Sequence, residues 1–199
     1  MIIELVLFVL LLLLWISTIS LTALAQSKEE NFLTYENHTF GIKIRYPPDW
    51  TIDEKNAALY NNQTMIVAFV KDFKSFSGDF LISVYDLTAN SSAHTISLGK
   101  LLDNIIDPYK KYIYTDFNLV ESNITHLAGK NNPAYKLVWI DPEGQYTIKT
   151  MQIGTIINHK LYVIQYYAEL EKYSDNLPII QKMVDSLQIH NTTIQRNVQ

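Results

Sequence analysis

Cysteine is absent from all 199 residues of this chain. The absence excludes disulfides, thiolate nucleophiles, cysteine-ligated zinc or iron–sulfur centres, and the lipidated cysteine of a bacterial-type lipoprotein. An excess of charge of one sign is also missing, because 16 basic residues stand against 20 acidic residues with no block of like charge. Recognition of a phosphate backbone needs clustered lysine and arginine, so we expect no nucleic-acid partner.

The patterns of common enzyme families are missing as well. The sequence holds no G-x-S-x-G elbow, Walker-type glycine-rich loop, H-E-x-x-H helix or G-x-G-x-x-G fingerprint. No two of the five histidines stand at a metal-ligand spacing; they are His38, His94, His126, His159 and His190. Asp141 and Glu143 beside Gly144 faintly resemble a calcium loop, but the later oxygen ligands are absent and a β-turn explains them better. We expect no catalytic residue, metal or cofactor, and a protein that is not an enzyme.

One feature that is present is a long uncharged run at the amino terminus, residues 5–27. Ala23 and Ala25 form an A-x-A pattern directly before Gln26, as a signal-peptidase site requires. We therefore interpret residues 1–25 as a signal peptide cleaved after Ala25. The alternative is an uncleaved membrane anchor, because the run is long enough to span a bilayer and no lysine or arginine precedes it. Both predict an extracytoplasmic protein, secreted or anchored to the outer face of the cytoplasmic membrane.

N-x-[ST] sequons also indicate an extracytoplasmic protein. The chain holds five of them, and none has proline in the middle position. An Asn- and Thr-rich loop composition is the alternative explanation. The candidate glycosylation sites are Asn37, Asn62, Asn90, Asn123 and Asn191.

Hydrophobic periodicity predicts one domain over residues 32–190, after a polar linker at residues 26–31 and before a tail at residues 191–199. Alternating apolar residues, bounded by turn residues, predict strands that pair mostly as antiparallel hairpins. The turns include Asp141 to Gly144 and the two-residue loop Asn158-His159. The expected strands are residues 32–35, 40–46, 65–70, 80–87, 117–126, 133–140, 145–157 and 160–168.

Two helices are expected between and after these strands. The first begins at a Thr95 or Ser97 cap and is kinked or ended by Pro108. The second is expected to be capped by Asn176, with Pro178 in its first turn.

Three stretches carry a resemblance to a known family: FLTYENHTFGIKIRYPPDW at residues 32–50, NHKLYVIQYYA at residues 158–168, and DSLQI at residues 185–189. They resemble the PsbP-like family, which includes the extrinsic PsbP protein of photosystem II and shares its fold with Ran-binding Mog-type proteins. The resemblance implies an α+β fold, an α/β/α sandwich with a central antiparallel sheet of about six strands and helices on both faces. It also implies no catalytic site common to the family, and a buried Trp50 at the end of the first stretch.

The candidate contact surface is chosen from tyrosines, of which there are 13. Residues 131–173 hold no sequon, so a glycan does not shield them. Within them we expect Tyr167 and Tyr173 to anchor a partner while Glu169 and Glu171 steer its approach. The alternative is an ordinary strand-to-helix connection.

The function expected from the sequence is that of a non-catalytic extracytoplasmic binding or accessory protein of the PsbP-like type. It would act through protein–protein contacts with an unknown partner at the outer, membrane-facing surface, and it would contact the membrane through residues 5–27 if these are uncleaved. Two alternatives stay open: a secreted hydrolase whose residues converge only in three dimensions, and a carrier of a small apolar ligand or lipid.

Overall fold

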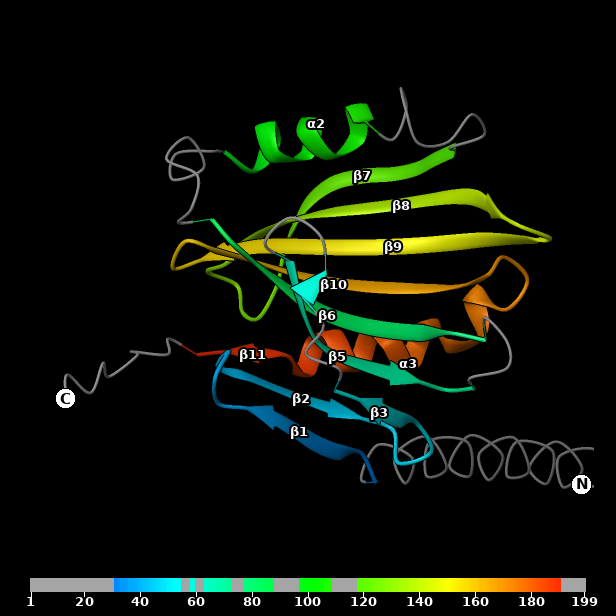
Figure 1. Cartoon of the computed structure of the whole chain (residues 1–199), viewed down its shortest axis with the longest axis horizontal. Helices are drawn as coiled ribbons and strands as arrows, with labels where there is room; N and C mark the ends of the chain where they lie inside the picture. The colour runs from blue at the N-terminus through cyan, green and yellow to red at the C-terminus, as the bar shows by residue number, and fades with distance from the viewer. Residues whose placement is uncertain are drawn as a thin grey trace, which may run out of the picture. The chain divides into compact units, whose positions relative to one another are not determined.

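The computed structural model describes residues 31–54, 58–59, 63–72, 77–87, 97–108 and 118–190 (Figure 1). The predicted signal or anchor, the linker as far as residue 30 and the carboxyl-terminal tail lie outside these residues, so those predictions stay untested. The described residues from Thr34 onward belong to one compact unit. Within the described ranges, no helix is both long and apolar enough to cross a membrane.

The described part of the chain is an α+β fold with two helices, α2 (Leu98–Pro108) and α3 (Tyr173–Ser186). A large antiparallel sheet has the strand order β3-β5-β6-β10-β9-β8-β7, with β4 paired alongside β5, and a small sheet has the order β1-β2-β11. The strands are β1 Leu33–Asn37, β2 Ile42–Tyr46, β3 Thr51–Asp53, β4 Ala58–Leu59, β5 Gln63–Val70, β6 Asp79–Asp86, β7 Asn118–His126, β8 Pro133–Glu143, β9 Tyr146–Ile157, β10 Lys160–Glu169 and β11 Gln188–Ile189.

The antiparallel sheet is confirmed, but the expected count of about six strands is wrong. The large sheet has eight strands, and the first two predicted strands pair in the separate small sheet. The sequence misses β3 and β4 because three and two residues are too short to show alternation. The small sheet is not predicted from the sequence, because it pairs Ile189 with Ile42, and these residues lie near opposite ends of the domain in the sequence.

The helices lie on opposite faces of the large sheet, as expected. Ile106 of α2 packs in a buried cluster with odd-numbered strand residues, among them Tyr135 and Val163. On the other face, the hydroxyl of Tyr166 donates to the carbonyl of Tyr173 in α3 over 2.8 Å. Side chains alternate along a strand, so Val163 and Tyr166 on β10 point to different faces.

The start of α2 agrees with the predicted Ser97 cap. The backbone N–H of Lys100 donates to the Ser97 hydroxyl over 3.2 Å, which satisfies one of the free donors of the first turn. The described helix ends at Pro108, one residue beyond the predicted end. The predicted apolar face continues through residues 109–113, which lie outside the described residues.

The turns between the long strands agree only in part. Asn158 and His159 both have positive φ, 50° and 60°, as a two-residue type I′ hairpin requires. The predicted turn at residues 141–144 is wrong in its position, because β8 continues to Glu143 and the turn follows at Gly144. Asp141 therefore lies in the strand, opposite Ile148.

The start of α3 differs from the prediction. The helix begins at Tyr173 after Lys172, with no side-chain capping bond, because the turn that leaves β10 continues directly into it. Asn176 is instead buried inside the helix, with 2% of its surface exposed. Its Nδ2 donates to the carbonyl of Ser77 over 2.6 Å, and its Oδ1 accepts from Nζ of Lys71 over 2.8 Å. Asn176 thus fixes both ends of the loop between β5 and β6 to α3.

Asn176→Ala is expected to lower the free energy of unfolding by about 1–2 kcal/mol, because the variant loses the bond from Lys71 and removes the donor of the half-buried Ser77 carbonyl. Urea unfolding of parent and variant measures the difference. Ser174→Ala, an exposed change in the same helix, serves as the control and is expected to stay within about 0.5 kcal/mol of the parent. Equal losses in the two variants would contradict a bridging role for Asn176.

Candidate functional site

The four residues of the predicted contact surface do not share one environment. Tyr167 is half-buried on β10, Glu169 ends that strand, and Glu171 is exposed in the following turn. Glu169 forms an ion pair with Lys172 over 3.0 Å. Side chains of β10 point alternately to the two faces of the sheet, and Val163 points to the α2 face. Tyr167 and Glu169 are four and six residues farther along the strand, so they point to the α2 face as well.

Tyr173 belongs to the core. It is 4% exposed, and burial raises the pKa of its hydroxyl to about 12. Its ring centroid lies 4.9 Å from that of Tyr166, and Nζ of Lys149 lies 4.6 Å from the ring centroid. The expectation that Tyr173 is an exposed anchor is therefore wrong, since a partner cannot reach a side chain enclosed by the fold.

Strand register brings acidic residues to the surroundings of Tyr167. Asp141 on β8 and Glu169 on β10 both lie opposite Ile148 of β9, one row farther toward the strand ends than Tyr167. The row of Tyr167 crosses four strands through directly opposite residues: Trp139 on β8, Thr150 on β9, Tyr167 on β10 and Asp79 on β6.

Tyr167 and Asp79 are hydrogen-bonded to each other. Burial raises the pKa of the Tyr167 hydroxyl far above its usual range, and the negative charges of Asp79 and Glu143 raise it further. Burial also raises the pKa of Asp79, as does the charge of Asp72, while the bond from Tyr167 opposes that rise. The tyrosine hydroxyl therefore donates to a carboxylate in a negatively charged environment.

Asp141 is the most enclosed of these acids, with 6% of its surface exposed. Its Oδ1 is buried and has no hydrogen-bond partner among the described residues. Burial raises the pKa of the carboxyl group and the charge of Glu143 raises it further, while a hydrogen bond from the Trp139 side chain lowers it. A buried acceptor without a partner is costly, so the charged form of Asp141 lowers the stability of the fold.

Asp141→Asn is expected to raise stability at neutral pH. A carboxyl group whose pKa is raised above the usual 3.8 stabilises the fold fully below pH 3.8, and this contribution is lost as pH rises through the folded-state pKa. Asparagine stays neutral, so the variant gains about 1.4 kcal/mol for each unit of the pKa rise that it removes. Thermal melts from pH 3 to pH 7 follow the gain, which should vanish at the acid end. Ser174→Ala, an exposed change that alters no charge, is the control and is expected to follow the parent at every pH.

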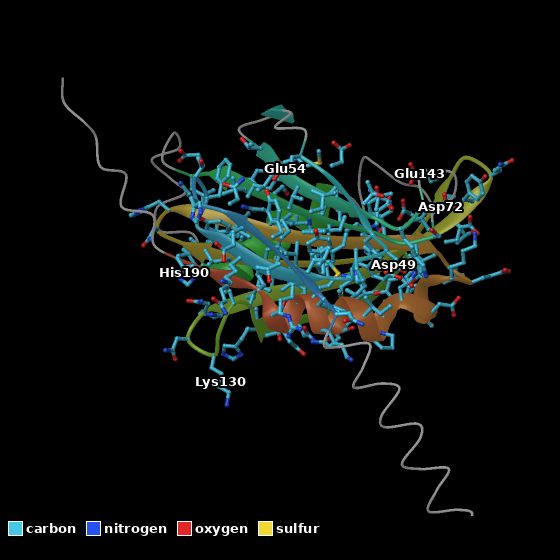
Figure 2. All side chains as sticks on the ribbon, turned by 90° about the horizontal axis from the view of Figure 1, so that it is seen from below. Asp49, Glu54, Asp72, Lys130, Glu143 and His190 are labelled. Carbon is cyan, nitrogen blue, oxygen red and sulfur yellow. The ribbon has the colours of Figure 1, made fainter. Side chains whose placement is uncertain are left out.

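We define the acidic end of the sheet as Asp72, Asp79, Asp141, Glu143 and Glu169, which come from four strands or the residues directly after them. In Figure 2, the labelled Asp72 and Glu143 project at one end of the domain, away from Lys130 and His190. In the described part of the chain, no group of three or more acidic or histidine side chains is arranged to hold a metal ion.

Sequence reasoning missed Asp72 and Asp79 and treated Asp141 and Glu143 as turn residues. Asp72 and Glu143, the first and last of these four residues, are 71 positions apart in the sequence. Only the pairing of β5, β6, β10, β9 and β8 brings them together. The signal that the sequence offers is weak: each acid stands at or next to the end of a predicted strand.

The candidate glycosylation sites differ in exposure. Asn123 is exposed on β7, and its Nδ2 donates to Oε1 of Glu121 over 2.8 Å. Asn37 is half-buried; its Oδ1 accepts from the N–H of Phe40 over 3.2 Å and its Nδ2 donates to the Tyr35 hydroxyl over 3.3 Å. Asn62, Asn90 and Asn191, like the cleavage residues Ala23, Ala25 and Gln26, lie outside the described residues. Glycosylation and cleavage stay predictions.

A second polar region lies on the small sheet. His38 and His190, far apart in the sequence, both line a pocket of about 270 Å³ there. Glu36 forms an ion pair with Lys43, which is the main reason that the pKa of the glutamate is lowered, and both histidines add to the effect. The other lining residues of the pocket are Asn37, Gly41, Ile42 and Gln188.

Comparison of the fold with solved structures gives several matches at low sequence identity. CyanoP, the cyanobacterial PsbP of Synechocystis sp. PCC 6803, matches with a TM-score of 0.57 and 11% identity, over 80% of this chain and 93% of that one. LpqN of Mycobacterium tuberculosis, described as involved in cell envelope biogenesis, gives 0.52 and 14%, over 84% and 96%. The Ran-binding protein Mog1p of Saccharomyces cerevisiae gives 0.51 and 11%, over 81% and 97%. At these identities the matches show the fold alone.

Sequence comparison adds the family. No curated protein matches the chain by sequence. The profile of the family described as PsbP-like protein, however, matches residues 17–189, which includes every strand and helix of the described fold. The first, second and third stretches of the resemblance noted above all fall within that match. The chain therefore belongs to the PsbP-like family.

Proposed function

We propose that this PsbP-like chain is a non-catalytic extracytoplasmic binding or accessory protein that contacts a basic segment of a partner protein through the acidic end of its sheet. One observation carries the proposal. Carboxylates from several strands gather around the half-buried Tyr167, whose hydroxyl donates to Asp79 and lies near the charge of Glu143. The extracytoplasmic location rests on the uncharged run at residues 5–27 and its A-x-A pattern.

The chemistry of the acidic end fits a guanidinium or ammonium group. Carboxylates accept charge-assisted hydrogen bonds from such groups, and these bonds are stronger than neutral ones. Like charges held close together raise each other's pKa, as Asp72 does for Asp79, and a cation that approaches them relieves this repulsion. Tyr167 adds a large amphipathic surface beside the charges, of the kind that often dominates binding energy. Long-range attraction then speeds the encounter.

Reversing the charge of one exposed carboxylate of the acidic end tests the proposal. Glu143→Lys is expected to reduce capture of the partner from membranes of the native host at least tenfold, because the new ammonium repels a basic segment. Asp103→Lys makes the same charge change on an exposed position of α2 and is expected to leave capture unchanged. Melting temperatures of both variants should equal that of the parent. If both reversals reduce capture equally, net charge rather than the acidic end is responsible.

The geometry does not favour the hydrolase alternative. Asp79 and Asp141 both have raised pKa values on one face of the sheet, as a pair of catalytic carboxyl groups often does. They stand on β6 and β8, however, which are separated by β10 and β9. Three strand spacings across the sheet and one row along the strands place their Cα atoms about 16 Å apart. That exceeds the range of about 5–9.5 Å over which paired carboxyl groups act on one glycosidic bond.

The pocket on the small sheet does not by itself favour the carrier alternative. A carrier of an apolar ligand needs a largely apolar pocket. The pocket at His38 and His190 is lined by charged and polar side chains together with Gly41 and Ile42.

A further inference from the structure

Two histidines lie at one end of the small sheet and take no part in the proposed function. His38 follows β1 and His190 follows β11, and both line the pocket of about 270 Å³ described above. Both residues are exposed, so a ligand in solution can reach them. In Figure 2, His190 lies at the end of the domain that is away from Asp72 and Glu143. The pocket is therefore a separate region from the acidic end.

Hydrogen bonds hold the walls of this pocket in place. The N–H of His190 donates to the carbonyl of Gly41 over 2.7 Å, which continues the pairing of β11 with β2 by one residue. The Asn37 side chain closes the turn between β1 and β2 by accepting from the N–H of Phe40. The Phe40 carbonyl in turn accepts from the hydroxyl of Tyr162 on β10 over 3.1 Å, which attaches the turn to the large sheet. A ligand therefore meets a site that is already built, and binding need not order the backbone.

The pocket can carry an excess of positive charge. Glu36 of β1 pairs with Lys43 of β2, and the nearby His38 and His190 add to the lowering of the glutamate pKa. These four are the charged or titratable residues among those that line the pocket in the described part of the chain. Glu36 balances Lys43, so the two imidazoles decide the net charge. Imidazoles ordinarily gain a proton as pH falls through about 6.5, and with both protonated the pocket carries a net charge of about +2.

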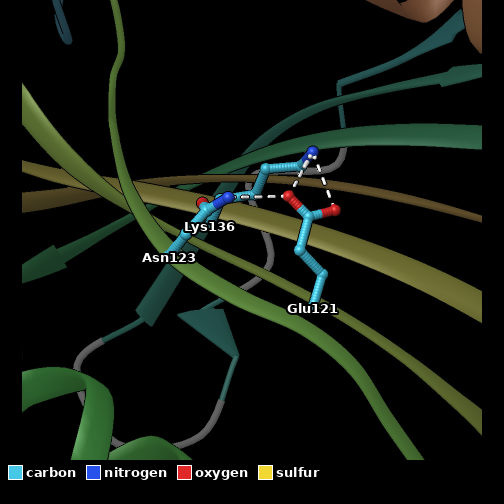
Figure 3. Close-up of polar contacts among 3 residues, drawn as sticks. All are labelled: Glu121, Asn123 and Lys136. Carbon is cyan, nitrogen blue, oxygen red and sulfur yellow. Dashed lines mark hydrogen bonds and ion pairs between the residues drawn. The ribbon is translucent and has the colours of Figure 1, made fainter.

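A second ion pair, between β7 and β8, shows the same chemistry without the imidazoles. Nζ of Lys136 lies 2.9 Å from Oε1 and 3.1 Å from Oε2 of Glu121, and Nδ2 of Asn123 donates to Oε1 over 2.8 Å (Figure 3). In these contacts one carboxylate balances one ammonium, and the third partner is a neutral amide. This pair is therefore a matched control for the pair of Glu36 and Lys43.

We propose that the pocket on the small sheet is an oxyanion site, which binds the phosphate or sulfate group of a small molecule when His38 and His190 are protonated. Imidazolium and ammonium groups donate charge-assisted hydrogen bonds to such oxygens, and the amide of Gln188 adds a neutral donor. The volume lies just below the range of about 300–1,000 Å³ that is usual for drug-sized ligands, so it suits a small polar group. When both imidazoles are neutral, Glu36 cancels the charge of Lys43 and weakens binding.

Sulfate is the probe for this site, because it keeps two negative charges at both about pH 5.5 and about pH 7.5. The full chain, labelled at its five histidines, is titrated with sulfate in mild detergent at constant ionic strength, and NMR follows the imidazole signals. The signals of His38 and His190 are expected to move, with an affinity at least tenfold higher at the lower pH, while those of His126 and His159 stay in place. If the pocket histidines do not respond, or respond with equal affinity at both pH values, the proposal is wrong.

Two carboxylate substitutions separate the site from a general effect of net charge. Glu36→Gln removes the acid and keeps every cation of the pocket, so sulfate is expected to bind at least fivefold more tightly at about pH 7.5. Glu121→Gln makes the same charge change and releases Lys136 in the same way, and it is expected to leave the affinity unchanged. The melting temperatures of both variants should stay close to that of the parent, because both residues are at the surface. Equal gains in the two variants would overturn the proposal.

The phosphate group can belong to a soluble ester or to a lipid headgroup, and competition with sulfate at about pH 5.5 distinguishes them. Glycerol phosphate carries the group without acyl chains, and a short-chain phosphatidic acid carries it with them. Equal potency of the two competitors supports the site and assigns it to soluble esters. A phosphatidic acid that is at least ten times more potent supports the site and assigns it to a lipid. Failure of both to displace sulfate from His38 and His190 contradicts the proposal.

Discussion

Trp50→Ala is expected to lower the free energy of unfolding by about 3–5 kcal/mol, the usual cost of removing a large aromatic side chain from a core. Trp50 is 4% exposed, although it stands directly after a turn on the surface. The turn explains how it becomes buried: the N–H of Trp50 donates to the carbonyl of Pro47 over 3.2 Å, which reverses the chain between β2 and β3. Pro47 and Pro48 have a fixed φ just before this residue, so the backbone sets the position of the indole.

The indole stabilises the fold through apolar contact. Its Nε1 has no hydrogen-bond partner among the described residues, so alanine loses no bond there, and the cost comes from lost contacts and the cavity that remains. Guanidinium unfolding of parent and variant measures the loss, and Leu33→Ala, at a residue 47% exposed, is the control with an expected cost of less than about 1 kcal/mol. A Trp50→Ala protein as stable as the parent, but impaired in partner capture, would show that the indole belongs to a binding site.

Local features of the sequence predicted local structure well. The alternation of Ile42, Ile44 and Tyr46 marks β2, and all three are buried. The hairpin at Asn158-His159 and the cap at Ser97 depend on a few neighbouring residues, and both are present. These predictions succeed because each rests on backbone preferences or side-chain bonds within one turn.

Features that depend on distant residues were not predictable in the same way. Asn176 has the residue type of a helix cap, but its position within α3 and its bonds to the loop after β5 are decided by where the helix packs. The acidic end depends on register: a shift of one residue in β8 would turn Asp141 to the other face of the sheet. Tyr167 is half-buried on β10, whereas Tyr173 follows it by only six residues and is buried, because α3 folds back over β10.

Strand pairing also explains why a glycine stands in the middle of β9. Gly154 lies directly opposite Tyr135 of β8, and the tyrosine ring covers it. A Cβ at this position would lie 2.6 Å from the Tyr135 hydroxyl oxygen and closer still to the ring carbons. Tyr135 is fully buried, so the ring cannot swing into solvent to make room. Glycine here is required by the packing of one aromatic ring, in the cluster that also holds Ile106 of α2.

Gly154→Val is therefore expected to lower the free energy of unfolding by about 3 kcal/mol, the upper end of the usual cost of overpacking, because two methyl groups are added to a Cβ that already overlaps the ring. Gly99→Ala, on α2 with no atom near the new methyl group, is the control and should stabilise by up to about 1 kcal/mol. A double-mutant cycle with Tyr135→Ala isolates the cause. Tyr135→Ala is costly alone, but in that background valine at position 154 meets no ring and fills part of the space that the ring leaves. Its cost should then fall below about 1 kcal/mol. If valine costs as much without the ring as with it, the glycine is required by the backbone of β9 and not by its neighbour across the sheet.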